Sequence, residues 1–319
     1  MNKTMAYKVI LLAMLCLSIN VSATNAKVDS REYKILLNPS LFTGDESVRI
    51  SKINDYWKVL KSLIEKGALK SEASGHLNLE KSRTVSFYDV QGSCDLLNAG
   101  YSFRERVENG KRKVTLKFRS ADQLLASAQD LRGKKSKAKS KFEEDIAVPF
   151  ISTYSSSTTQ KIGNSKNLNK MDDPAGLYPG LKNEHFDESL AIEKVSNLTI
   201  NEYVYKSENI EIVNRVGVVD NEFSLSLWYN ESVSTTQAIV VEISFKYDNE
   251  QEEFNKNDSH NISNNSSKSS KSSKSSNEVK HAKELFMVMQ ENPLLAKWNS
   301  TDSLSKTATV YQYDSRFCH

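Results

Sequence analysis

Charged residues alternate with apolar residues along several short stretches of this sequence. Successive side chains of a β-strand point to opposite faces, so Arg104 and Arg106 would share one face of a strand. Phe103 would lie on the opposite face. The same spacing groups polar side chains elsewhere: Glu32 with Lys34, Thr115 with Lys117 and Arg119, Glu143 with Asp145, and Glu242 with Ser244 and Lys246. One polar face is typical of a solvated sheet, whereas several of them opposite apolar faces favour a closed barrel with the charges inside.

The hydrophobic pattern predicts an α+β fold, mostly antiparallel β, built as a closed, tunnel-like barrel of about eight strands with flanking helices. The dipeptide Asn109-Gly110 is typical of a tight hairpin turn between two of these strands. The expected strands are residues 31–38, 84–90, 101–108, 112–120, 141–148, 198–205, 210–219, 223–229 and 238–247. The expected helices are residues 55–66, 121–131 and 279–292.

The N-terminal segment, residues 1–23, has the pattern of a secretory signal peptide. Lys3 and Lys8 supply its basic start, a short apolar core follows, and Ala23 ends it at an expected cleavage site. The core is too short to span a bilayer, which needs about 20 residues, and no other stretch is apolar enough. We therefore expect a periplasmic or secreted protein without a membrane span.

The remaining chain, residues 28–319, is expected to form a single domain with a long irregular loop at 151–190. Residues 254–278 are rich in Ser, Lys and Asn and poor in apolar side chains, so we expect them to be disordered. Cys94 and Cys318 lie outside the predicted signal peptide. In an oxidising compartment they could form a disulfide, and the alternative is two unrelated thiols.

The overall charge of the chain limits its partners. Its 43 basic and 40 acidic residues give a net charge of +3, which is not the composition of a protein that coats nucleic acid. We therefore expect no specific nucleic-acid partner. The five histidines show no metal-ligand spacing. The charged strand faces are therefore the chemistry that needs an explanation, because charges inside a barrel must pair with one another or with a ligand.

Three segments between residues 87 and 119 form a recognisable pattern. Residues 87–89 read Phe-Tyr-Asp, residues 96–106 read Leu-Leu-Asn-Ala-Gly-Tyr-Ser-Phe-Arg-Glu-Arg, and residues 114–119 read Val-Thr-Leu-Lys-Phe-Arg. They resemble the CYTH domain, also called the triphosphate tunnel metalloenzyme family, whose pattern is Tyr-Phe-Asp-Thr, then Leu-x-x-x-Gly-x-x-Leu-Arg-x-Arg, then Thr-Leu-Lys-x-Arg. The match holds in order and spacing across residues 87–119 and is moderately specific there.

The resemblance implies an antiparallel tunnel that binds triphosphate compounds and, in its enzymes, cleaves them with a divalent metal. Basic residues at the matching positions would clamp the phosphates: Lys34, Arg104, Arg106, Lys117, Arg119 and Arg215. All of these except Arg215 would also act in catalysis, by positioning the phosphate chain and neutralising its charge. Acidic residues would hold Mg²⁺ or Mn²⁺ or orient the attacking water: Glu32, Glu143, Asp145 and Glu242.

The acidic motifs of this sequence depart from the family pattern. The family opens with Glu-x-Glu-x-Lys, whereas residues 30–34 read Ser-Arg-Glu-Tyr-Lys. The late Glu-x-Glu of the family is replaced by Glu-Ile-Ser at residues 242–244. A serine hydroxyl is a poor replacement for a carboxylate in a Mg²⁺ site, so both changes would weaken metal binding.

Three functions remain open on this evidence. The first is an exported, metal-dependent triphosphate hydrolase (a phosphoric anhydride hydrolase) acting on tripolyphosphate, nucleoside triphosphates or thiamine triphosphate. The second is a polyphosphate- or nucleotide-binding module on the same fold without catalysis, which the retained cations and degraded acidic motifs favour. The third is a structural or interaction protein whose charged strand faces neutralise one another.

Overall fold

The computed structural model describes most of the chain: residues 26–66, 72–73, 75–207, 210–214, 217–232, 234–248, 269–301 and 304–319. The predicted signal peptide, residues 1–23, and Arg215 lie outside this part. Within it, none of the helices is long and apolar enough to span a bilayer.

The described residues contain more β-strand than helix, and most of the helices lie at the periphery. The strands are β1 (Ser30–Leu37), β2 (Leu77–Asp89), β3 (Tyr101–Glu108), β4 (Lys111–Ser120), β5 (Lys139–Ala147), β6 (Ile151–Lys161), β7 (Glu193–Lys194), β8 (Ile200–Ser207), β9 (Ile210–Asn214), β10 (Gly217–Asn230) and β11 (Ser234–Asp248). The helices are α1 (Glu46–Lys66), α2 (Asp95–Asn98), α3 (Gln123–Ser127), α4 (Asp172–Leu177), α5 (Ser269–Glu291), α6 (Pro293–Ala296) and α7 (Lys306–Gln312). Three short 3-10 turns complete them: η1 (Pro39–Phe42), η2 (Pro179–Glu184) and η3 (Val195–Asn197).

The strands close into a barrel, as the sequence predicted. Their order is β11-β1-β5-β6-β4-β3-β2-β8-β10, and β10 pairs with β11 to complete the ring. The extra strands β9 and β7 pair with β10 and β2. Neighbours in the ring are antiparallel except β1 and β5, which run parallel. The barrel is therefore mixed, and it has one more strand than the predicted eight.

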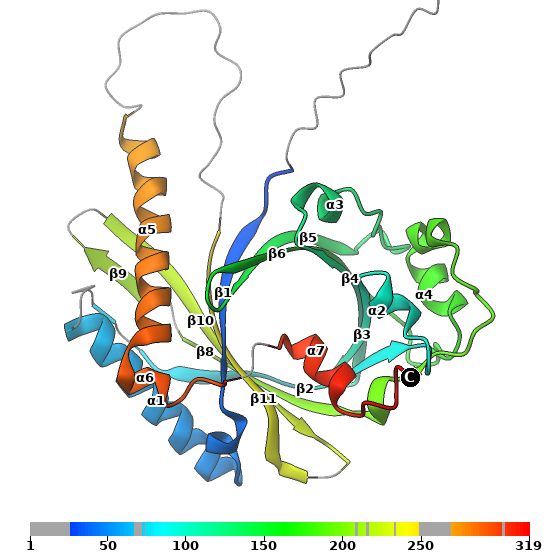
Figure 1. Ribbon diagram of the computed structural model, residues 1–319, viewed down its shortest axis with the longest axis horizontal. Helices are drawn as coiled ribbons and strands as arrows, with labels where there is room; N and C mark the ends of the chain where they lie inside the picture. Colours follow the sequence, from blue (N-terminus) through cyan, green and yellow to red (C-terminus); the bar gives the residue numbers. More distant parts are fainter. Residues whose placement is uncertain are drawn as a thin grey trace, which may run out of the picture.

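Helices cover the outside of the ring on two sides (Figure 1). Helices α1 and α5 pack against β1, β10 and β11, where Tyr33, Ile35 and Phe245 join one apolar cluster. The segment around α4 covers β3 and β4, where Phe103 and Leu116 join a second cluster. Because these apolar residues face outward, the charged residues that alternate with them line the interior, as predicted.

The predicted loop at 151–190 is wrong over its first part, because residues 151–161 form β6 between β5 and β4. This strand escaped prediction because it is polar on both faces. Ser155 faces the interior, while Thr158 and Gln160 are buried on the outer side. The Gln160 amide and the Tyr178 hydroxyl donate hydrogen bonds to backbone carbonyls there, and these contacts replace the hydrophobic alternation that usually marks a strand.

Several element boundaries also differ from the prediction. Helix α1 begins at Glu46 rather than 55, and Asp45 accepts a hydrogen bond from the Val48 amide at its start. The predicted strand 210–219 divides into β9 and the beginning of β10. Of the predicted helix 121–131, only residues 123–127 are helical, and they form α3. Helix α5 begins at Ser269, so residues 269–278 of the segment predicted to be disordered are helical, and residues 254–268 lie outside the described part.

The C-terminal helix α7 lies inside the ring and closes one end of it (Figure 1). Its Val310 and Tyr311 pack against the interior side chains Phe87 and Trp228. The Tyr311 hydroxyl donates a hydrogen bond to Oδ2 of the buried Asp89, 2.9 Å away. Beyond α7, a covalent bond links the C-terminal segment to the barrel.

This covalent link is a disulfide between Cys94, which precedes α2, and Cys318, with a Cα–Cα distance of 5.3 Å. Both cysteines belong to the apolar cluster that α7 completes. Apolar packing, a buried hydrogen bond and a disulfide therefore hold the C-terminal segment in the barrel.

We expect the Cys318→Ser variant to lower the free energy of unfolding by about 2–4 kcal/mol, because the unfolded chain gains freedom when the link is lost. Urea denaturation without reductant measures this. Cys94→Ser should give the same loss, and the double variant should lose no more, since all three lack the same bond. A single variant with unchanged stability would contradict the disulfide.

Candidate functional site

The strand register gathers the predicted site residues on the inner wall of the barrel. Arg104 lies opposite Thr115 on β4, and Lys117 lies opposite Ser102 on β3 and Ser157 on β6. The shared face further contains Lys34, Arg106, Arg119, Glu32, Glu143, Asp145 and Glu242. The alternation read from the sequence therefore placed these side chains on the correct face.

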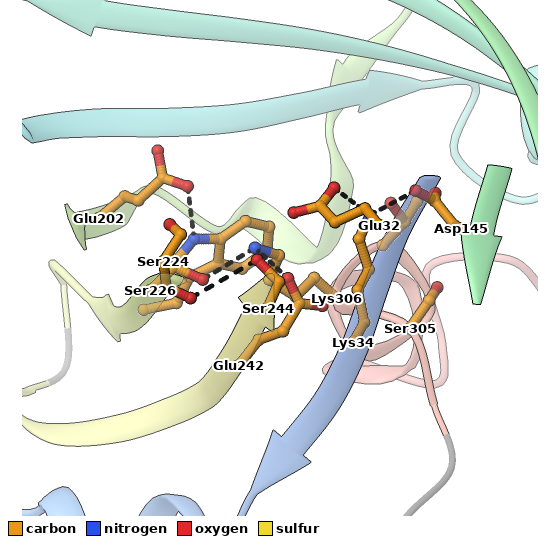
Figure 2. A network of polar contacts seen from close by, with 12 residues as sticks. Glu32, Lys34, Asp145, Glu202, Ser224, Ser226, Glu242, Ser244, Ser305 and Lys306 are labelled. Carbon is orange, nitrogen blue, oxygen red and sulfur yellow. Dashed lines mark hydrogen bonds and ion pairs between the residues drawn. The ribbon is translucent and has the colours of Figure 1, made fainter. Parts of the chain in front are cut away.

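Asp145 is the centre of charge on one side of the interior. Its carboxylate lies 2.6 Å from Nζ of Lys34, 3.2 Å from Nζ of Lys117 and 4.0 Å from Nε of Arg119. The Lys34 ammonium also lies 3.0 Å from Glu32 (Figure 2). Burial alone would raise the pKa of Asp145, but Lys117 and Lys34 hold it well below its usual range. Asp145 therefore stays ionised and neutralises part of this basic cluster.

Glu202 has the same role on the opposite side. It forms a short ion pair with Arg83, lies 3.6 Å from Nε of Arg106 and accepts a 2.9 Å hydrogen bond from the Trp228 indole. Burial favours a raised pKa, yet Arg106 and Arg83 lower the pKa of Glu202 far below its ordinary value.

Sequence reasoning missed Glu202 and Arg83. The strand containing Arg83 was predicted to begin only at residue 84, although it begins at Leu77. The available signal for Glu202 was its place in β8, where it alternates with the outward-facing Tyr203 and Tyr205. A lone acid on a strand is also typical of a solvated face, so the pattern alone did not distinguish the two.

Arg104 is the interior cation that the described part of the chain leaves without an acidic partner. Its Nε is buried and has no hydrogen-bond partner, and no ion pair reaches its guanidinium within these residues. Its guanidinium carbon lies 5.9 Å from the centre of the Phe87 ring. Burial and the neighbouring Arg106 lower the pKa of Arg104 well below its usual value. Glu202 opposes this shift only in part, so the charge on Arg104 is incompletely compensated.

Burial also disfavours the charged forms of Arg106 and Lys117. Burial, opposed in part by Glu202, lowers the pKa of Arg106 to about 10. Burial, with Arg119 and Lys34 adding to it against Asp145, lowers the pKa of Lys117 to about 8. β3 and β4 therefore present adjacent basic side chains that the surrounding carboxylates do not fully neutralise.

The carboxylates predicted to hold a metal do not form a metal site. Glu32 and Asp145 share Lys34, and Glu242 pairs with Lys306 at 2.7 Å. Glu143, on the inner face, lies 3.3 Å from the exposed ammonium of Lys141. No group of three His, Cys, Asp or Glu side chains in the described residues could hold a metal ion. The donor set therefore does not fit Mg²⁺ or Mn²⁺, because ammonium groups already occupy its carboxylates.

Comparison with known proteins finds distant structural similarity. No family model and no curated protein matches the sequence. Among solved structures, a candidate adenylyl cyclase from Hippeastrum with a dominant triphosphatase activity is 14% identical, with 88% of this chain and 94% of that chain covered and a TM-score of 0.41.

Two further structures are a candidate adenylate cyclase from Bacillus halodurans and a protein from Pyrococcus horikoshii. The first is 11% identical, with coverages of 87% and 96% and a TM-score of 0.35. The second is 10% identical, with coverages of 88% and 99% and a TM-score of 0.32. Scores this low support no transfer of activity, so the description of the tunnel rests on the geometry of this chain.

Two interior substitutions should change stability in opposite directions. Glu202→Gln should lower the free energy of unfolding by about 3–5 kcal/mol, because Arg83 and Arg106 lose their shared counter-charge. Arg104→Met should leave it unchanged or raise it by about 1 kcal/mol, because a charge without an ion-pair partner is removed from the same interior. Urea denaturation of both variants measures the difference. Equal losses would contradict the charge assignment.

Proposed function

We propose that the tunnel binds a linear phosphate chain, such as tripolyphosphate or the triphosphate group of a nucleotide or of thiamine. The observation that carries this proposal is Arg104, a half-buried cation beside Arg106 whose Nε is buried without a hydrogen-bond partner and which has no ion pair in the described residues. A cation that is removed from water without an ion pair is costly, and an anionic ligand removes that cost. Guanidinium groups bind phosphate oxygens through paired, charge-assisted hydrogen bonds.

The arrangement of the basic residues suits a chain better than a single anion. Arg104 and Arg106 lie along β3, and Lys117 and Arg119 lie along the neighbouring strand β4. The cations therefore form two adjacent rows. Each phosphate of a linear chain offers negative charge along one line, and successive units can meet successive cations. Single carboxylates or isolated phosphates would engage only part of this surface.

The two ends of the tunnel support entry from one side. Helix α7 closes the end near Trp228, while the register places Lys113, Lys139 and Lys246 toward the other end. Basic side chains around an opening raise the local concentration of anions and their rate of entry. We therefore propose that the phosphate chain enters at the lysine-lined end.

Binding is proposed here in preference to metal-dependent hydrolysis. The sequence predicted both, but hydrolysis relied on Glu32, Asp145 and Glu242 as metal ligands, and each of these carboxylates contacts a lysine. The catalytic roles assigned to Lys34 and the other basic residues stay predictions. We also propose an exported protein, and the disulfide supports this because such bonds persist in oxidising compartments.

The proposal is tested by titrating tripolyphosphate into the protein without residues 1–23, in the presence of chelator, by isothermal calorimetry. The Arg104→Ala/Arg106→Ala variant should bind at least about 100-fold more weakly, because two charge-assisted contacts are lost at about 1.5–3 kcal/mol each. Lys134→Ala/Lys135→Ala is the matched control, since it removes two positive charges from an exposed segment. Equal affinities for the two variants would refute binding in the tunnel.

The affinity should also depend on pH through Lys117, whose pKa is about 8. As the pH rises above this value, the ammonium is lost and binding of the phosphate chain weakens. In the free protein, the free energy of unfolding changes with pH in the opposite direction to the binding affinity. The pKa of Lys117 in the folded protein lies below the ordinary lysine value of 10.5, so the free energy of unfolding rises between about pH 8 and 10.5. Calorimetric titrations at several pH values measure the first effect and urea denaturation the second.

Lys117→Arg provides the control for this pH dependence, because an arginine stays charged throughout this range. Its affinity should decline less than that of the wild type between pH 8 and 10. Identical pH profiles for the two proteins would show that Lys117 does not titrate in the binding site.

A further inference from the structure

Lys306, the first residue of α7, points into the tunnel toward Glu242 (Figure 2). Its Nζ lies 2.7 Å from Oε1 of Glu242 and 2.8 Å from Oγ of Ser226. The same ammonium lies 5.4 Å from the centre of the Trp228 ring. Glu242 is only 6% exposed, so this contact supplies a counter-charge to a buried carboxylate.

The position of Lys306 is fixed by the contacts of its helix. Ser305 caps α7 by accepting a hydrogen bond from the Ala308 amide, 3.2 Å away. Arg119 donates a 2.8 Å hydrogen bond to the Thr307 hydroxyl. At the other end, the Tyr311–Asp89 hydrogen bond and the disulfide hold the segment. Lys306 is therefore a positioned cation and not a surface lysine that happens to reach inward.

The wall around Glu242 offers hydroxyl groups in place of further acids. Across the strands, Glu242 lies opposite Ser226, and the neighbouring inward position holds Ser244. Ser244 lies opposite Lys34 on β1 and Ser224 on β10. A carboxylate that is flanked by serines and already bonded to an ammonium is a weak site for Mg²⁺, which prefers carboxylates and phosphate oxygens and keeps several waters.

We infer that the ammonium of Lys306 takes the place of a divalent metal at Glu242, so that the tunnel binds its phosphate chain without Mg²⁺ or Mn²⁺. This inference rests on the proposed function, because it concerns how that ligand is held. Lys306 supplies a permanent positive charge near the closed end, where the chain terminates. Free Mg²⁺ then competes with the protein, because it binds the phosphate oxygens in solution and lowers the charge that the cations recognise.

The first test is calorimetric titration of tripolyphosphate into the wild-type protein, in chelator and in excess Mg²⁺. We expect tighter binding in chelator and weaker binding when Mg²⁺ is added. Lys306→Ala should weaken binding in chelator, while Lys306→Arg should keep it, because the arginine retains the charge. Binding that occurs only when Mg²⁺ or Mn²⁺ is present would overturn the inference.

The second test needs no phosphate ligand. Tb³⁺ binds carboxylate sites, and a nearby tryptophan sensitises its luminescence. Lys306→Ala leaves Glu242 without its ammonium beside Trp228, so tryptophan-sensitised Tb³⁺ emission should rise several-fold over the wild type. Lys280→Ala is the control, because it removes one charge from an exposed position on α5 and should match the wild type.

The two tests separate the inference from the proposed function. If tripolyphosphate binds under neither metal condition, the proposed function fails, while the Tb³⁺ comparison still decides whether Lys306 occupies a metal position. Emission from Lys306→Ala no greater than that from Lys280→Ala would overturn the assignment of Lys306. Circular dichroism of each variant shows whether a change in calorimetric signal or in Tb³⁺ emission comes from a loss of fold. Lys306→Arg, which retains the charge, is the second control.

Discussion

The need to balance charge inside a closed barrel determines most of this structure. The outer face of the strands packs against helices, so the charged residues that alternate with this apolar face point into the ring, where they lose much of their hydration. Asp145 and Glu202 each neutralise several cations, and Glu242 neutralises Lys306. Arg104 has no ion-pair partner among the described residues, and its buried Nε supports our proposal that a further anion binds in the tunnel.

The C-terminal segment links this charge balance to the closure of the barrel. The face of α7 formed by Val310 and Tyr311 fills the apolar end of the interior, and its first residue, Lys306, brings a cation to the acidic wall. One short helix therefore both seals the tunnel and adjusts its charge. Because the helix is only seven residues long, it depends on the disulfide and on buried contacts and not on its own stability.

The sequence predicted the parts of the fold that local periodicity controls. Arg104 alternating with Phe103 identified an inner wall, since the two-residue period of a strand can be read without knowing its partners. β6 could not be read in this way, because its serines and threonines are polar on both faces. The position of Lys306 was also unpredictable, since it requires the chain to fold back into a barrel formed by residues far away in sequence. For the same reason, motif spacing assigned Glu242 to a metal, although the fold brings a lysine to it.

The central claim is that the interior cations hold a phosphate chain without a metal, and a crystal structure with tripolyphosphate in chelator tests it most directly. The account predicts a continuous phosphate chain inside the ring, with oxygen atoms in hydrogen-bond contact with the guanidinium groups of Arg104 and Arg106 and no metal peak beside Glu242. A chain bound outside the barrel, or an interior chain bridged to Glu242 by a cation after metal is supplied and absent without it, would contradict the account.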